Sequence, residues 1–252
     1  MVKTSTSARS PLSPTRYPRE AFPWWGSLGL AAALIAATIA SLVVVVGILM
    51  SFNLASPKDF RTLSWANILI ELGSLAAYLA VLVPGLPAIA RRSLSDLGLR
   101  APRGGDLVWA LGGAAAMLIV ASAIGAIQDA AFHLKPDQVT VHWLRDARAP
   151  LVASLVVLAC IAAPVVEELT FRGFLFNAIL RYFPSWVAAL VSGVLFGLAH
   201  SATGAGSIAP LAAGGIVLAV VYYRSGSLTA SILTHALFNT FTVVVVLVFH
   251  QQ

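Results

Sequence analysis

Hydrophobic positions along the chain form long apolar runs, and short polar segments separate them. Five of the seven runs reach the roughly 20 residues that a helix needs to cross a bilayer, and the fifth and sixth are short. The expected spans cover residues 28–50, 65–86, 107–127, 151–182, 186–200, 208–223 and 228–249. The pattern therefore predicts an all-α fold, a polytopic transmembrane bundle of about seven helices. We expect Pro84 and Pro87 to end the second span, because proline interrupts helical hydrogen bonding.

The polar segments indicate how the chain is organised. Residues 1–22 are polar, basic and proline-containing, which predicts a disordered N-terminal tail. Residues 23–150 form a three-span region, and residues 151–250 form a C-terminal region that carries most of the unusual polar residues. The fourth run is long enough that it must tilt, bend or protrude, and Pro164 is a candidate kink.

Composition supports the membrane assignment. The chain is 59% hydrophobic and 10% charged, whereas soluble domains carry about 25% charged residues. Its net charge of +6 comes mainly from arginines and lysines between spans, so we do not interpret it as nucleic-acid binding. With the N-terminus inside, the cytoplasmic segments hold ten of the 16 basic residues. Positive charge favours the cytoplasmic side. We therefore expect an integral protein of a bacterial plasma membrane with a cytoplasmic N-terminus.

Charged residues inside the fourth run are the strongest functional signal. Glu167, Glu168 and Arg172 lie between two stretches without any charge, and each intramembrane charge costs on the order of 2.5–3.5 kcal/mol. In a helix, Glu168 and Arg172 share a face, while Glu167 points about 100° away. Arg172 can therefore pair with Glu168 and leave Glu167 free for chemistry. The alternative is an ion pair that only joins helices.

Further polar residues occur in other spans. His200 ends the fifth run, and His235 and Asn239 lie four residues apart on one face of the seventh. Together with Glu167 they supply a carboxylate and imidazoles to move protons and an amide to stabilise an oxyanion. Glu167, His200 and His235 could equally hold Zn²⁺ with an open position for water. Glu71, in the second span, either supports this site or forms a separate structural contact.

Three motifs in this order resemble the CPBP intramembrane proteases, also called the CaaX protease or Abi family. They are Glu167-Glu168-xxx-Arg172, Phe196-xxx-His200 and His235-xxx-Asn239. The resemblance covers roughly residues 151–249, the catalytic region. It implies that Glu167 and His200 activate the attacking water. It also implies that Glu168 and Arg172 support them and that His235 and Asn239 stabilise the transition state.

The resemblance implies an intramembrane endopeptidase that acts on a membrane-associated peptide or protein. Its attacking water could be bound to a metal ion or activated without one. The pattern favours neither water mechanism outright and does not identify the substrate, the relevance of prenylated substrates or the oligomeric state. One alternative is a non-catalytic scaffold or bacteriocin-immunity protein of the same fold. A transporter that uses Glu71 and the two glutamates as proton sites is disfavoured, because the spans show no obvious inverted repeat.

Overall fold

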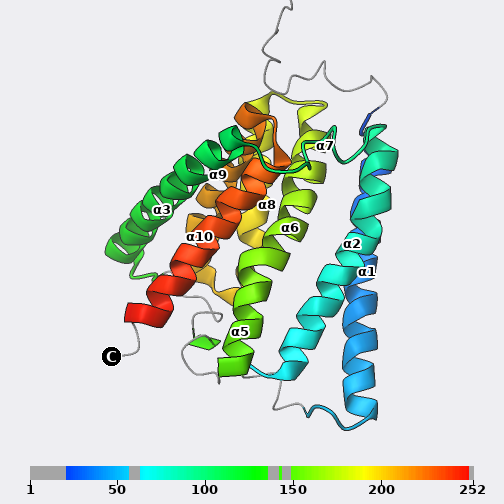
Figure 1. Ribbon diagram of the computed structural model, residues 1–252, viewed down its shortest axis with the longest axis vertical. Coiled ribbons are helices and arrows are strands. Elements are labelled where there is room, and N and C mark those ends of the chain that lie inside the picture. Colours follow the sequence, from blue (N-terminus) through cyan, green and yellow to red (C-terminus); the bar gives the residue numbers. More distant parts are fainter. Residues whose placement is uncertain (1–20, 57–62, 136–141, 144–148, 250–252) are drawn as a thin grey trace, which may run out of the picture.

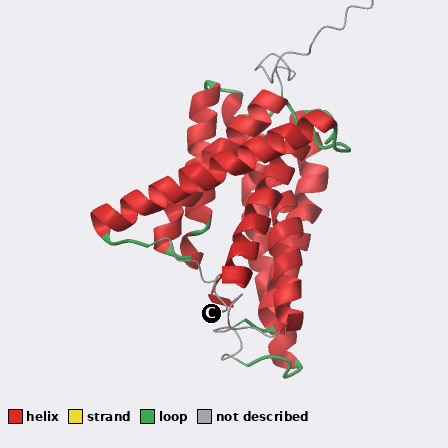
Figure 2. Ribbon diagram, turned by 60° about the vertical axis from the view of Figure 1, so that its left-hand side comes forward, coloured by secondary structure: helices red, strands yellow, loops and turns green. Residues whose placement is uncertain are grey.

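The computed structural model describes residues 21–56, 63–135, 142–143 and 149–249. All regular structure in these ranges is helical, as Figures 1 and 2 show. Six helices are long and apolar enough to cross a membrane, and the shorter α8 is a further apolar helix. The all-α prediction is therefore confirmed. Most of the predicted tail lies outside the described residues.

The first three helices are long and uninterrupted. They are α1 (Trp24–Ser51), α2 (Trp65–Ala90) and α3 (Gly104–Phe132). The prediction that Pro84 and Pro87 end the second span is wrong, since both lie inside α2. Proline is tolerated in membrane helices where neighbouring groups satisfy the freed backbone. Leu86 and Ala90, beyond the first of these prolines, are buried in the core, which favours continuing the helix.

The fourth apolar run is one continuous span with changes of helical type. It comprises α5 (Ala149–Val157), η2 (Leu158–Ala162), α6 (Ala163–Glu168), η3 (Leu169–Phe176) and α7 (Asn177–Leu180). Both η2 and η3 are π-helical, a form that often occurs at functional sites. The irregularity expected at Pro164 is thus a π segment, η2, which ends two residues before this proline. The two glutamates lie between the two π segments.

The C-terminal helices complete the bundle. They are α8 (Ser185–Ala199), α9 (Ile208–Ser225) and α10 (Leu228–Phe249), with two short 3₁₀ turns, η4 (Ser201–Thr203) and η5 (Ala205–Ser207), between α8 and α9. Helix α9 packs against α8, α3 and α10, whereas α1 pairs with α2 at the other side of the fourth span (Figure 1). A Cβ at Gly193 would lie 2.8 Å from Ile216 N and 2.9 Å from Ala212 O, so glycine permits the close contact of α8 with α9.

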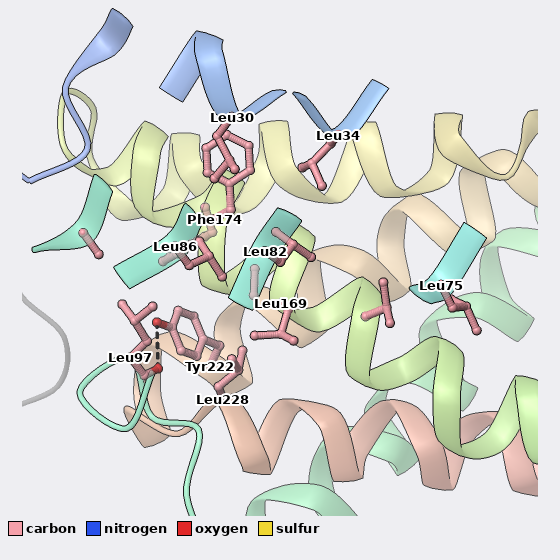
Figure 3. Packing of buried hydrophobic residues seen from close by; sticks show 14 of the residues in the cluster. Leu30, Leu34, Leu75, Leu82, Leu86, Leu97, Leu169, Phe174, Tyr222 and Leu228 are labelled. Atoms are coloured by element: carbon pink, nitrogen blue, oxygen red, sulfur yellow. Dashed lines mark hydrogen bonds between the residues drawn. The ribbon is translucent and has the colours of Figure 1, made fainter. Parts of the chain in front are cut away.

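The hydrophobic core joins the α1–α2 pair to the fourth span. Figure 3 shows Leu30 of α1 and Leu82 and Leu86 of α2 close to Phe174 of η3. Tyr222 of α9 extends this cluster, and its hydroxyl donates to Leu97 O at 3.2 Å. The segment between α2 and α3 is thereby attached to the helices that carry the candidate site.

Gly98 fixes the start of α10 against the segment between α2 and α3. Its carbonyl accepts from Leu228 N at 3.1 Å and Thr229 N at 3.3 Å, and its φ of +94° is one that L side chains rarely adopt. A Cβ there would lie 2.7 Å from Leu228 N. We expect Gly98→Ala to lower the free energy of unfolding by at least about 1–2 kcal/mol.

Thermal unfolding in detergent measures this effect. Gly112→Ala is the matched control, because Gly112 lies in α3 and a Cβ there would meet nothing within 4 Å. Alanine in an ordinary helical position should be neutral or stabilising. Equal melting temperatures for the two variants would show that the Gly98 turn does not hold α10.

Candidate active site

Glu168 is the buried centre of the polar cluster. Its side chain is fully buried and accepts hydrogen bonds from three side chains, one in η3 and two in α10. Arg172 Nη1 donates to Oε1 at 2.8 Å and Ser231 Oγ donates to Oε2 at 2.6 Å. His235 Nδ1 lies 3.1 Å from Oε1. The carboxylate is therefore satisfied by its neighbours, as expected for a supporting residue and not for a proton acceptor.

Arg172 joins Glu168 to α9 and to α8. Besides its bond to Glu168, it donates from Nη2 to Gly215 O at 2.6 Å. Its guanidinium carbon lies 5.0 Å from the centre of the Phe196 ring, within the range of a cation–π interaction. The pairing of Glu168 with Arg172 predicted from their spacing is present in the structure.

Glu167 occupies a different environment from its neighbour. Its side chain is 25% exposed, and Oε2 lies 3.9 Å from His200 Nε2 and 3.8 Å from His235 Nε2. These distances exceed those of hydrogen bonds. In the part of the chain that the structure describes, Oε2 is buried without a hydrogen-bond partner. Glu167, His200 and His235, from three different spans, thus converge on one point.

The second nitrogen of each imidazole indicates its tautomer. His200 Nδ1 lies 2.7 Å from Phe196 O, and His235 Nδ1 faces the Glu168 carboxylate. Both partners are acceptors, so we infer that each neutral ring carries its proton on Nδ1. Both Nε2 atoms then present lone pairs towards Glu167 Oε2. Three acceptors that face one another favour a group that donates protons or carries positive charge between them.

Phe196 packs between these groups. Its ring centre lies 4.7 Å from that of His200 and 5.6 Å from that of His235, and the ring is almost completely buried. The ring itself offers no hydrogen-bonding group. Each imidazole is therefore held by its Nδ1 partner and by its apolar contact with this ring. The ring therefore restricts the orientations in which both Nε2 atoms can face Glu167.

The predicted Asn239 follows His235 by one turn of α10, and its amide hydrogen bond lies outside the Glu167 cluster. Its amide donates to Ala159 O, in the π segment η2, at 2.7 Å. One N–H of the amide remains available beyond this bond, because a side-chain amide carries two. The proposed role of Asn239 in stabilising an oxyanion stays a prediction.

Two polar residues of this network were not predicted from the sequence. Ser231 lies four residues before His235, so the spacing of Ser231, His235 and Asn239 on one face of α10 could have indicated it. The two N–H groups of Asn177 Nδ2 serve three acceptors between them, Arg172 O at 2.8 Å, Gly173 O at 3.0 Å and Tyr222 Oη at 2.9 Å. No sequence pattern indicates the role of Asn177, because this role depends on backbone carbonyls within the π segment η3.

The side chains around Glu167 include the types of ligand that bind zinc. One carboxylate and two imidazoles, each imidazole with its other nitrogen held, are typical ligands of catalytic zinc. The unpartnered Glu167 Oε2 fits such a role. Among the described residues, however, no three histidine, cysteine, aspartate or glutamate side chains are gathered closely enough to hold an ion. The zinc site on Glu167, His200 and His235 thus stays a prediction.

Comparison with known proteins identifies relatives of the region that contains this cluster. Residues 149–241 match the family described as "Type II CAAX prenyl endopeptidase Rce1-like". The chain is also similar to "Putative membrane peptidase YdiL" of Bacillus subtilis (strain 168), with 25% identity over 206 residues that cover 81% of this chain and 82% of the relative. No solved structure matches the chain. The family match begins at α5 and ends within α10.

Proposed function

Because residues 149–241 match the type II CAAX prenyl endopeptidase family, we propose that this membrane protein hydrolyses peptide bonds in membrane-associated substrates with water activated by Glu167 and His200. The observation that carries the proposal is the convergence of His200 Nε2 and His235 Nε2 on the unpartnered Glu167 Oε2. A water between these acceptors can donate a hydrogen bond to two of them. Its oxygen is then available to attack a carbonyl carbon.

The proposed proton transfers follow from the separate roles of the two glutamates. Glu167 accepts a proton from water, because Arg172 and Ser231 engage Glu168 instead. His200 shares that proton through Nε2 and returns it to the leaving amine. His235 can donate from Nε2 to the oxyanion once it carries a second proton, and the remaining N–H of Asn239 is the other candidate donor.

A cleavage assay tests the proposal directly. Purified protein in detergent micelles is incubated with a defined pool of single-span peptides, and mass spectrometry identifies new termini. We expect new termini with the native protein and none with Glu167→Gln. Identical products from both proteins would remove Glu167 from the proposed mechanism, whereas no products from either would contradict catalysis and favour a scaffold or immunity role.

A divalent cation is a second way to activate the same water. Glu167, His200 and His235 would hold it, and bound Zn²⁺ lowers the pKa of its water to about 7. If this cation is present, elemental analysis should find about one zinc ion per chain and at least tenfold less in His235→Ala, because loss of a side chain that merely orients a ligand already weakens metal binding by about 10–100-fold. Chelation should then stop cleavage and added Zn²⁺ should restore it, whereas the metal-free route predicts unchanged cleavage after chelation. Full activity in metal-free protein would exclude the metal route.

A further inference from the structure

Glu71 is a charged residue that the proposed mechanism does not use. It is the one charged side chain of α2, and apolar residues surround it in the sequence. Its side chain is exposed, and no described residue forms a hydrogen bond or an ion pair with it. An unpaired carboxylate facing lipid would cost several kcal/mol, so intramembrane carboxylates normally face a polar interior or a wet cavity.

The position of α2 indicates which side Glu71 faces. Helix α2 contacts α5, α6 and η3, the segments that precede, contain and follow Glu167 (Figure 1). The Glu71 carboxylate lies within electrostatic range of both Glu167 and His200. Since α2 borders the fourth span and the charges of Glu167 and His200 act on Glu71, we place its exposed side chain on the side of α2 that faces the candidate active site.

The formal charges of the residues around the candidate active site do not cancel. Arg172 neutralises Glu168 at 2.8 Å, which leaves the charges of Glu167 and Glu71. When Glu167 and Glu71 are ionised and both histidines are neutral, the site therefore has a net negative charge. In the described ranges no arginine or lysine pairs with either of these two carboxylates. A low-dielectric site of this kind attracts cations and repels anions, and both effects are stronger than they would be in water.

We propose that Glu71 is a specificity-determining residue that binds a basic side chain of the peptide substrate. The residue lies on a different helix from Glu167, so it can contact substrate residues next to the bond that the activated water attacks. This inference rests on the proposed proteolytic function. It assigns to Glu71 the selection of the substrate and leaves water activation to Glu167 and His200.

The experiment compares peptides that differ by one charge. A set of quenched fluorescent single-span peptides carries lysine, glutamine or glutamate at successive positions, and kcat/KM is measured for each peptide. We expect native protein to favour lysine over glutamine about tenfold at one or two positions and to disfavour glutamate there. In Glu71→Gln the ratio of kcat/KM for the lysine peptide to that for the glutamine peptide should fall to about one. The kcat/KM for the glutamine peptide should stay close to the native value.

Leu72→Gln is the matched control, because it places the same amide at the neighbouring position, about 100° around the helix. It should keep the lysine preference. A Glu71→Gln enzyme that keeps the preference would overturn the proposal. So would one that loses cleavage of all peptides equally, or one that loses only bound zinc, since Glu71 would then act in catalysis or in metal binding. Absence of cleavage by native protein would instead contradict the proposed function itself.

Discussion

Glu167→Gln is expected to reduce peptide cleavage by about 10²–10⁴-fold, the usual contribution of a general base. The substitution replaces the oxygen that faces both histidines with a group that cannot accept a proton from water. It keeps the size of the side chain. Glu168 retains Arg172, Ser231 and His235 as partners. The loss should therefore affect kcat much more than protein stability.

Initial rates and thermal unfolding of the same detergent preparation measure the two quantities. Ser231→Ala provides a contrasting variant, because it removes one hydrogen bond from Glu168 without touching Glu167. We expect Ser231→Ala to lose more stability than Glu167→Gln and to retain more activity. Native rates in Glu167→Gln would remove Glu167 from the proposed mechanism.

The spans and the core of the candidate site could be predicted because strong local constraints determine them. Long apolar runs have few stable forms in a bilayer other than helices, and each of the six membrane-length helices, as well as the shorter α8, overlaps a predicted span. The pairing of Glu168 with Arg172 follows from a separation of four residues. The predicted family resemblance is also confirmed, since residues 149–241 contain all three motifs.

The features that could not be predicted depend on contacts between distant segments. Helix α2 continues through Pro84 and Pro87 because its last turns pack into the core. The backbone carbonyls of the π segments accept hydrogen bonds from side chains of other segments. One example is the bond from Asn239 to Ala159 O, which joins residues 80 positions apart. The tautomers of His200 and His235 follow from their Nδ1 partners, which only the folded chain reveals.

Arg172→Ala should have the largest effect on stability. The fully buried Glu168 would lose its only charged partner among the described residues, and Gly215 O would lose a donor at 2.6 Å. Breaking a buried pair by removing one member costs about 3–5 kcal/mol, because the other charge stays uncompensated. The contacts of the guanidinium with Phe196 would also be lost. Activity should fall as well, since Phe196 packs against both histidines.

Comparison of single and double variants separates the charge from the packing. Glu168→Gln combined with Arg172→Met removes both charges and keeps much of the volume, and replacing both members of a buried pair is often close to neutral. We therefore expect the double variant to unfold at a higher temperature than Arg172→Ala. Adding the single variants Glu168→Gln and Arg172→Met completes a double-mutant cycle, which reports the interaction energy between the two sites. If Glu167→Gln proves less stable than Arg172→Ala, then Glu167 holds the structure and the roles assigned to the two glutamates are reversed.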